Sequence, residues 1–438
     1  MIIQLEGALK RQEERLVQQL MELLEYGVTA AHVVEYVKKE LLQHSFQELN
    51  LEDEWTLQKN QGYYVNLYGT NCFAFRTGVQ MNQTPSFRIA MAHSDYPCFQ
   101  IKPSPMIEGK HFEKLNVEIY GGMNQKSWLD RPLGVAGKVV VKGESVFTPQ
   151  TLLYKSGRPL CIIPSLAVHM DRELNKKGVT ETSKELMPLT ALSEGQDILE
   201  TVAQELNLKK EDILDYDLYL YNMESPKTVG LDSSMLASPR LDNLTSVSAE
   251  LTGLKSCENV PDNTVDAMMV FDNEEVGSLS KQGADSELLP MLIDKIGKAF
   301  YKDRFKKSDI LAKSFLLSAD VAHANHPNYE EKSDGNNRAY MGQGVSIKRS
   351  VGQKYGTTAE SAAVIKQICK ENDIPYTIAI NKTGIPGGST LGPIVTSHLP
   401  IPCADVGMPI LAMHSATELC AVADYDALEA LICAYWNE

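Results

Sequence analysis

Apolar residues near the start of the chain recur at helical spacing. In Glu6–Glu25, leucines three to seven positions apart alternate with charged residues, which predicts an amphipathic helix. Gly27 is a typical helix terminator and Thr29 a typical N-cap residue. Valines and leucines then fall on one face of Ala31–Leu42. We therefore expect two helices at the beginning of the fold.

Strand patterns follow these helices. The stretch from Trp55 to Arg88 breaks into short runs rich in Tyr, Val and Phe, separated by turn sequences such as Asn-Gln-Thr-Pro, which predicts strands and hairpins. The run Phe87–Ala92 is typical of a buried sheet strand, and further apolar strand patterns follow at Ala267–Phe271, Ser314–Ser318 and Tyr376–Ile380. The later runs alternate with helical patterns, as in an α/β domain.

The middle of the chain has a different pattern. Between Cys98 and Ser238 the apolar runs are short and β-like, as in Leu115–Tyr120 and Gly137–Val141, and the polar stretch Arg172–Gly195 interrupts them. A length of 438 residues exceeds what one hydrophobic core usually supports. We expect an α/β fold with a mixed sheet, formed by residues 1–97 and 238–438, interrupted by a β-rich domain of residues 98–237.

Composition and charge narrow the class of protein. The chain is 43% hydrophobic and 23% charged, which is typical of a globular protein. A formal net charge of −15 disfavours binding to nucleic acid or to anionic membranes, and the longest basic cluster, Lys302–Lys307, is interpreted as a solvated helix end. No secretory signal or membrane-spanning apolar run is evident, and the eight cysteines form no Cys-x-x-Cys pair. These features predict a cytoplasmic protein.

Ionisable residues follow five of the apolar runs directly. In an open α/β sheet, the carboxyl ends of the strands are where binding sites form. One such residue alone is more often structural, but two histidines and three carboxylates among these residues make a nitrogen and oxygen ligand set that suits zinc. The absence of Cys from the set argues against a structural zinc site. The residues are His93 and Asp95, Asp242, Glu274 and Glu275, Asp320 and His323, and His414.

Seven motifs in order resemble the aspartyl aminopeptidase family of dinuclear zinc exopeptidases. The resemblance covers nearly the whole chain. Its motifs are HSDYPCFQIKPSP from His93, SWLDRPLGVAG from Ser127, RLDN from Arg240, FDNEEVGSLSKQGADS from Phe271, SADVAHANHPNY from Ser318, GGSTLGP from Gly387 and DVGMPILAMHS from Asp405.

The resemblance implies two zinc ions per subunit. His93 and Asp320 correspond to the terminal ligands of one ion, Glu275 and His414 to those of the other, and Asp242 to the carboxylate that bridges both. Two such ions share an activated water and polarise the scissile carbonyl. Manganese or cobalt are also compatible with these ligands.

The resemblance also assigns two acidic residues to catalysis. Glu274 corresponds to the general base, which takes a proton from the attacking water and returns it to the leaving amine. Asp95 is expected to accept a hydrogen bond from the ring nitrogen of His93 that does not bind metal. Taken without the flanking motif, a Glu-Glu pair such as Glu274–Glu275 is more commonly a solvated turn.

Three further residues correspond to substrate contacts in the family. They are His323, Lys348 and His169, the last reaching the active site of a neighbouring subunit. Each has a structural alternative: His323 as a histidine at a helix start, Lys348 as an exposed strand lysine, and His169 as a buried structural histidine.

The implied function is removal of single N-terminal residues, expected to be acidic (Asp or Glu), from peptides with a free N-terminus. The inserted domain is expected to form dimers that assemble into a homo-oligomeric dodecamer. The sequence contains no Gly-x-Ser-x-Gly elbow and no HExxH motif, which excludes the interpretations as a serine hydrolase and as a single-zinc protease. The open alternatives are an aminopeptidase that prefers neutral residues such as Leu, a dinuclear-zinc amidohydrolase or deacylase, and a catalytically silent assembly protein.

The sequence departs from the family pattern at three places. The continuation after Lys348 is RSVGQKYGTT, the segment before the Gly-Ser-Thr turn reads Ile380-Asn381-Lys382-Thr383, and Gly387 stands where a Cys is usual. All three lie outside the expected metal ligands. The sequence therefore does not determine the substrate preference of the specificity pocket, whereas the expected metal chemistry is unaffected.

Overall fold

The computed structural model describes residues 17–438 except 108, 193–194, 258 and 386. The chain forms two compact units. The first contains the residues up to Asp95 together with Pro226–Met413 and Glu418–Glu438, and the second contains Tyr96–Ser225 and His414–Thr417.

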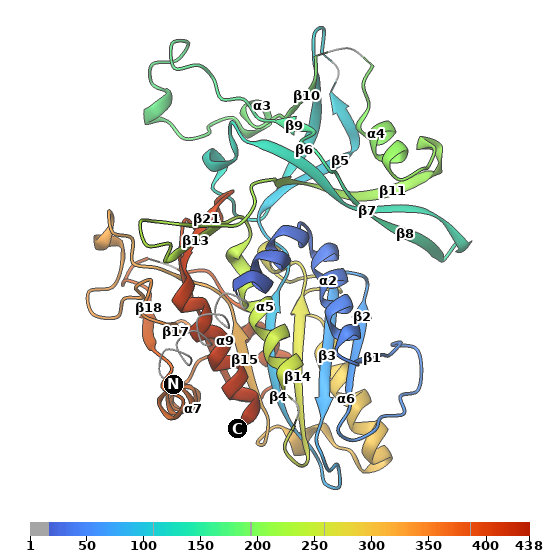
Figure 1. Ribbon diagram of the computed structural model, residues 1–438, viewed down its shortest axis with the longest axis vertical. Coiled ribbons are helices and arrows are strands. Elements are labelled where there is room, and N and C mark those ends of the chain that lie inside the picture. Colours follow the sequence, from blue (N-terminus) through green and yellow to red (C-terminus); the bar gives the residue numbers. More distant parts are fainter. Residues whose placement is uncertain (1–16, 108, 193–194, 258, 386) are drawn as a thin grey trace, which may run out of the picture. The chain divides into compact units, whose positions relative to one another are not determined.

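A nine-stranded mixed sheet is the centre of the first unit (Figure 1). Its middle strands pair in parallel in the order β14, β4, β15 and β19, while β3 and β17 pair antiparallel to their inner neighbours. In sheet order the strands are β1 (Gln47–Glu48), β2 (Gly62–Leu67), β3 (Asn71–Thr77), β14 (Thr264–Phe271), β4 (Ser86–His93), β15 (Phe315–Ala319), β19 (Cys403–Gly407), β17 (Val345–Arg349) and β18 (Tyr376–Ile380).

Helices cover both faces of this sheet, because its central strands are apolar on both sides. Every residue of β14 is buried, as expected for a strand enclosed between helix layers. One core cluster joins one face to α2 (Ala30–Gln43), α5 (Leu241–Ser256), α7 (Ala359–Glu371) and α9 (Val422–Asn437). The other joins the opposite face to α6 (Leu288–Tyr301) and α8 (Leu391–His398).

The expected N-terminal helices are present where the chain is described. Residues 17–26 are helical, and the remainder of the predicted helix Glu6–Glu25 lies outside the described residues. Thr29 occupies the N-cap position of α2, but its side chain makes no cap hydrogen bond. Its hydroxyl instead lies 2.8 Å from Nδ1 of His32, so the predicted N-cap position is confirmed although the side chain does not bond to the helix backbone.

A smaller five-stranded sheet also belongs to the first unit. The hairpin of β12 and β13 lies here because β13 pairs with β21, whereas the sequence pattern placed these residues in the inserted domain. The strands in order are β12 (Lys227–Val229), β13 (Met235–Ser238), β21 (Glu418–Ala421), β20 (Pro409–Leu411) and β16 (Ala322–His323). Short 3-10 turns complete the unit at η4 (Glu274–Val276), η5 (Lys302–Arg304), η6 (Lys307–Ile310) and η7 (Glu330–Lys332).

The second unit is built on a seven-stranded antiparallel sheet. Because β11 pairs with β7 as well as with β5, the sheet closes on itself, and Trp128 packs edge-on against Phe99 in its core. Its strands in order are β11 (Ile213–Asn222), β5 (Cys98–Ile107), β6 (Glu113–Tyr120), β10 (Leu189–Ala191), β9 (Cys161–Ile162), β7 (Pro132–Ser145) and β8 (Thr148–Lys155). The helical segments are η1 (Gln125–Trp128), η2 (Leu174–Lys176), α3 (Thr182–Glu185), α4 (Ile198–Glu205) and η3 (Lys210–Asp212).

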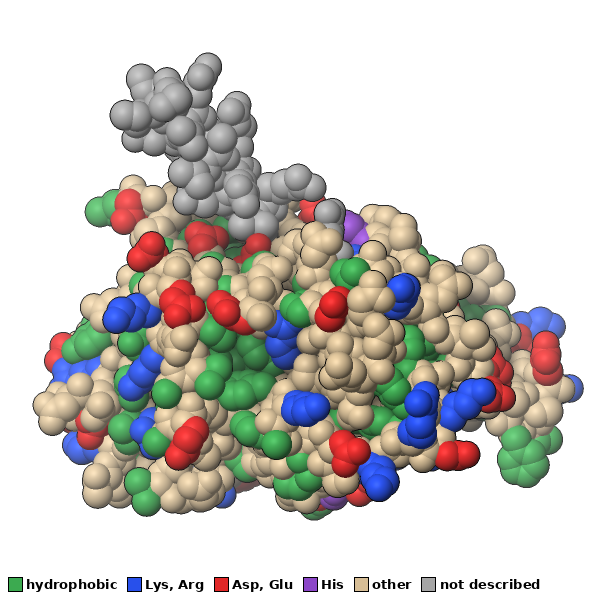
Figure 2. Space-filling model, turned by 90° about the horizontal axis from the view of Figure 1, so that it is seen from below, with side chains coloured by type: hydrophobic (Ala, Val, Ile, Leu, Met, Phe, Trp, Pro, Cys, Tyr) green, Lys and Arg blue, Asp and Glu red, His purple; other side chains and the backbone are tan. Residues whose placement is uncertain are grey.

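The expected fold class, an α/β fold with a mixed sheet plus a β-rich domain, is confirmed. Within the stretch Arg172–Gly195, which the pattern treated as an interruption, the structure contains α3 and β10. In the described part of the chain, no helix has the length and apolar character needed to span a bilayer. On the face shown in Figure 2, basic and acidic side chains are interspersed.

Candidate active site

Three neighbouring strand ends form one edge of the candidate site. His93 is the last residue of β4 and pairs in register with Phe271, the last residue of β14. On the other side of β4, Ser318 pairs with Met91, so Asp320 follows β15 at the level of His93. The parallel strands therefore end together, and the short turn η4 after β14 brings Glu274 and Glu275 to the same edge.

Asp242 comes from a different part of the unit. It follows β13 of the five-stranded sheet and opens α5, so the expectation that it follows a strand of the main sheet is wrong. The chain turns sharply here: Arg240 has a left-handed backbone with φ 64°, and Asp242 has the non-helical angles φ −77° and ψ 106°. This turn directs the chain from the small sheet into the helix.

The first unit brings His93 together with the carboxylates. Its Nε2 lies 3.3 Å from Oδ1 of Asp242 and 3.6 Å from Oδ1 of Asp320. Potential ligand atoms of these three residues all lie within 4.8 Å of one another, and the same holds for His93 with Glu274 and Glu275. The carboxylates of Asp242, Asp320, Glu274 and Glu275 thus lie close to one buried imidazole.

The donor chemistry of this cluster fits a divalent cation. Burial alone would lower the pKa of His93, but hydrogen bonds with Asp242, Asp320 and Asp95 raise it well above its usual value. A concentration of buried and half-buried anionic groups of this kind is costly unless positive charge compensates it. A mixed nitrogen and oxygen set without cysteine suits catalytic zinc.

Asp95 contacts both the His93 ring and the turn that carries Glu274 and Glu275. The Nδ1 atom of His93 lies 3.1 Å from the backbone oxygen of Asp95 and 3.5 Å from its Oδ1. The carboxylate also accepts the backbone N–H groups of Glu274 and Glu275, both at 3.1 Å. Asp95 therefore orients the turn that carries both glutamates in addition to contacting the His93 ring.

The carboxyl group of Glu274 has a pKa that is shifted toward neutral pH. Burial raises the pKa of its carboxyl group to about 7; His93 opposes the rise, and the carboxylates of Asp320, Asp95 and Asp242 add to it. A group whose pKa lies near the working pH can both accept and return a proton.

Lys348 is buried in β17, so the alternative of an exposed strand lysine is wrong. Its ammonium group donates to Oδ2 of Asp320 and to the carbonyl oxygen of Val321, both at 3.2 Å, and lies 5.2 Å from the centre of the Tyr355 ring. Burial raises the pKa of Asp320, but the Lys348 charge and the His93 hydrogen bond outweigh this, so the net shift is downward. Both groups are therefore charged at neutral pH.

A pocket of about 310 Å³ opens beside Lys348. His323, which lies in strand β16 and not at a helix start, contributes to its wall. Its lining includes a group of side chains with nitrogen atoms that can donate hydrogen bonds: His323, His326, Lys332, Asn337, Arg338, Lys348, Asn381 and Lys382. Aromatic and apolar groups complete it, among them Tyr329, Tyr355 and Ile385.

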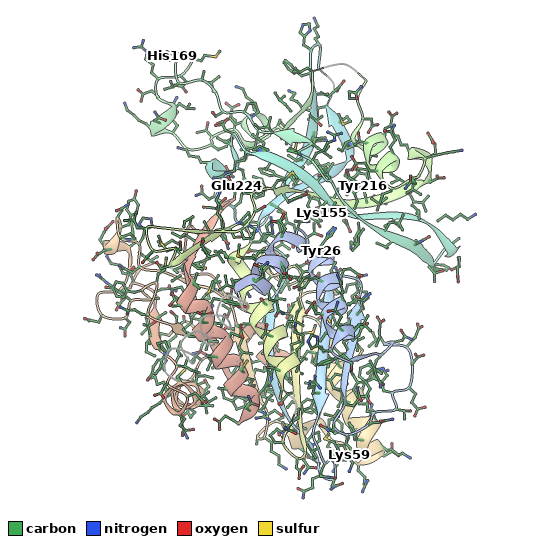
Figure 3. The ribbon with its side chains drawn as sticks, in the orientation of Figure 1. Tyr26, Lys59, Lys155, His169, Tyr216 and Glu224 are labelled. Carbon is green, nitrogen blue, oxygen red and sulfur yellow. The ribbon has the colours of Figure 1, made fainter. Side chains whose placement is uncertain are left out.

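Two predicted residues belong to the second unit. His414 has a left-handed backbone, and its Nδ1 lies 2.9 Å from the carbonyl oxygen of Gly122, which selects the tautomer whose Nε2 carries the lone pair. His169 lies in an exposed turn, so its alternative as a buried histidine is wrong. Figure 3 shows His169 on the long loop that projects from the second unit between β9 and α3. Their roles as ligand and as substrate contact stay predictions.

Sequence reasoning missed two polar residues that contact the Asp242 turn. Glu418 accepts the backbone N–H of Asp242 at 3.0 Å, and the side chain of Asn243 donates to the carbonyl oxygen of Ala319 at 2.8 Å. Asn243 stands inside the RLDN motif, but Glu418 is a single acidic residue at the start of a short strand, and no local pattern distinguishes it.

Comparison with known proteins gives a consistent result. The family model described as "Aminopeptidase I zinc metalloprotease (M18)" matches residues 23–436. A "Probable M18 family aminopeptidase 2" of Clostridium novyi is 38% identical over 413 residues, covering 93% of this chain and 95% of that protein. Its namesake in Clostridium acetobutylicum is 35% identical over 433 residues, covering 98% and 100%.

Solved structures match over almost the whole chain. A structure titled "Cryo-EM structure of the Ape4 and Nbr1 complex" aligns with a TM-score of 0.92 at 27% identity, covering 97% of this chain and 86% of that one. Another, titled "Structure of S. cerevesiae mApe1 dodecamer", aligns with a TM-score of 0.85 at 22% identity, covering 98% and 97%.

Proposed function

Because the chain belongs to the M18 family of zinc metalloprotease aminopeptidases, we propose that it removes single acidic residues, Asp or Glu, from the free N-terminus of peptides. The observation that carries this preference is the pocket beside Lys348, whose lining is rich in cationic and other nitrogen-donor groups. A carboxylate side chain is the complementary ligand for such a lining.

Lys348 is the cation best placed to distinguish acidic from neutral N-terminal residues of the substrate. Its ammonium group has three N–H donors, of which Asp320 and Val321 accept two. Because Lys348 is only 3% exposed, a contact with a substrate carboxylate would be poorly screened by solvent. A charge-assisted hydrogen bond of this kind contributes about 1.5–3 kcal/mol, or roughly one to two orders of magnitude in selectivity.

We assign the metal ligands as follows. By the resemblance to the family, His93 and Asp320 would hold one zinc ion, Glu275 and His414 would hold the other, and Asp242 would be a ligand shared by both. Bound zinc supplies Lewis-acid polarisation of the scissile carbonyl and lowers the pKa of water.

The chain's own residues handle the proton. Glu274 accepts the proton of the attacking water and returns it to the leaving amine, for which a pKa of about 7 is suitable. Asp95 keeps Glu274 aimed at the reaction centre through the backbone hydrogen bonds of η4. No nucleophilic side chain is needed.

We further propose that subunits assemble into a dodecamer built from dimers, with His169 of one subunit contacting substrate in the next. The similarity to a structure described as a dodecamer supports this assembly. The exposed turn that carries His169 also displays apolar side chains, including Leu166, Val168 and Met170, which a neighbouring subunit would cover.

Kinetics with aminoacyl anilides of Glu, Asp and Leu test the substrate class. We expect kcat/KM for the acidic substrates to exceed that for Leu by about 10- to 100-fold. A preference for Leu would identify a neutral aminopeptidase, and hydrolysis of N-acylated amino acids in place of the anilides would identify a deacylase. Either result contradicts the proposal.

A further inference from the structure

The backbone that presents Asp242 is not held by regular secondary structure. Asp242 and Asn243 both have non-helical angles although they lie at the start of α5, and Arg240 before them is left-handed. The first two residues of a helix also lack intrahelical partners for their N–H groups. The direction of the Asp242 carboxylate therefore depends on contacts made by other segments.

One contact comes from β21. Glu418 is only 3% exposed, and its Oε2 accepts the backbone N–H of Asp242 at 3.0 Å. Another buried carboxylate beside an anionic cluster is energetically unfavourable, because like charges in a poorly solvated site repel each other strongly. Its presence at this position therefore points to a specific role. Holding the backbone of a metal ligand would be such a role.

A second contact comes from the next residue. Asn243 is fully buried, and its Nδ2 donates to the carbonyl oxygen of Ala319 at 2.8 Å. Ala319 is the last residue of β15 and directly precedes Asp320. This hydrogen bond therefore ties the turn carrying one carboxylate to the strand end carrying the other.

We propose that Glu418 and Asn243 are positioning residues that form a two-point clamp on the Asp242 turn, fixing the Asp242 and Asp320 carboxylates relative to His93 for binding of a divalent cation. The clamp joins three separate elements, β21, α5 and β15, at the place where their ends converge. Its partners are backbone groups, so it acts on the direction of the ligands without contacting substrate. The inference rests on the proposed ligand assignment.

Zinc affinity tests the clamp independently of turnover. We would measure zinc per subunit against buffered free zinc, and the visible spectrum after cobalt substitution, for the full-length wild type, Glu418→Gln, Glu418→Leu and Asn243→Ala. Glu418→Gln keeps an acceptor for the Asp242 N–H and should bind zinc within threefold of wild type. Glu418→Leu and Asn243→Ala should bind at least one zinc about 10- to 100-fold more weakly, with an altered cobalt spectrum.

A matched control is Glu429→Leu, which removes a buried carboxylate from α9 at a distance in sequence from every proposed ligand. It should change thermal stability but not zinc affinity. Wild-type zinc affinity in folded Glu418→Leu and Asn243→Ala would overturn the clamp. If Glu418→Leu does not fold, Asn243→Ala decides alone by the same tenfold criterion. A wild type that binds no zinc pair would instead refute the ligand assignment.

Discussion

Lys348 combines two roles at the scale of single residues. It compensates the charge of Asp320 within the buried cluster, and it forms part of the wall of the neighbouring pocket. A buried ion pair fixes both partners, because removing either one leaves an uncompensated charge. The Lys348–Asp320 ion pair would therefore couple the choice of substrate to the arrangement of the proposed metal ligands.

The variant Lys348→Gln separates charge from hydrogen bonding in the same anilide panel. Glutamine can still donate to Asp320 but carries no charge, so the preference for Glu over Leu should fall by about 10- to 100-fold. The matched control is Lys382→Gln in the same pocket, where the ammonium is exposed and should contribute less than about threefold. Equal effects of the two variants would argue that the pocket attracts acidic residues through its general charge.

Two departures from the family pattern prove to be spatially coupled. A Cβ atom added at Gly387 would lie 2.0 Å from Nδ2 of Asn381, closer than atoms can approach. The amide of Asn381, which lies 3.5 Å from the Tyr355 hydroxyl, therefore occupies space that a side chain at residue 387 would need. Because Asn381 and Tyr355 line the pocket, these departures from the family pattern lie at the pocket and not among the proposed metal ligands.

At the scale of elements, α5 carries an unusual row of polar groups. Ser246 and Glu250 lie four positions apart on one helix face, Asn243 lies in the non-helical turn just before them, and each of the three is buried. Among the described residues, no hydrogen-bond partner is found for Oδ1 of Asn243, Oγ of Ser246 or either carboxyl oxygen of Glu250. Buried polar atoms without partners destabilise a fold.

Glu250 should make stability depend on pH. Burial raises its pKa well above the ordinary value of 4.5, so the folded state holds this proton more tightly than the unfolded state. The stabilisation that comes from protonated Glu250 is fully present below the pKa that Glu250 has in the unfolded chain. It is lost as the pH rises toward the higher pKa of Glu250 in the folded protein. Glu250→Gln removes this dependence, so its advantage in thermal stability over wild type should grow from pH 5 to pH 7, by up to about 1.4 kcal/mol per pH unit.

Thermal melts of both proteins across this pH range measure the effect. The control Glu371→Gln changes an exposed glutamate near the end of α7 and should follow the wild-type profile. A constant stability difference between Glu250→Gln and wild type at every pH would show that Glu250 does not titrate as inferred.

The sequence predicts the elements better than their long-range pairing. The apolar runs at β4, β14, β15 and β18 are unambiguous, and the polar residues at the first three strand ends identify the site because parallel strands end together. The β12–β13 hairpin could not be assigned to the first unit, since its partner β21 lies far along the chain. The positions of Glu418 and Lys348 depend on the same kind of non-local packing.

At the scale of the whole molecule, the central prediction is that active sites are completed between subunits. His169→Ala should lose catalytic efficiency while keeping zinc and quaternary structure. Mixed with Glu274→Gln, it should recover activity, because a heterodimer then contains one site with both residues intact. For two-fold symmetric pairs mixed equally, recovery should approach about a quarter of wild-type activity.

Subunit exchange must be verified by mass spectrometry of differently tagged chains before activity is compared. Hybrid particles that stay inactive after exchange, or a stable monomer with full activity, would contradict the sharing of sites. Activity that falls with dilution in step with dissociation would support it, because a site completed by two subunits exists only in the assembly.

The most direct test of the account is the turnover of Glu274→Gln at equal, measured zinc content. The substitution keeps the shape of the side chain and removes its capacity to accept a proton. We predict two zinc ions per subunit in both proteins and a fall in kcat of about 100- to 10,000-fold in the variant. Near-normal turnover with zinc in place would contradict the assignment of Glu274 as the base, and with it the proposed mechanism.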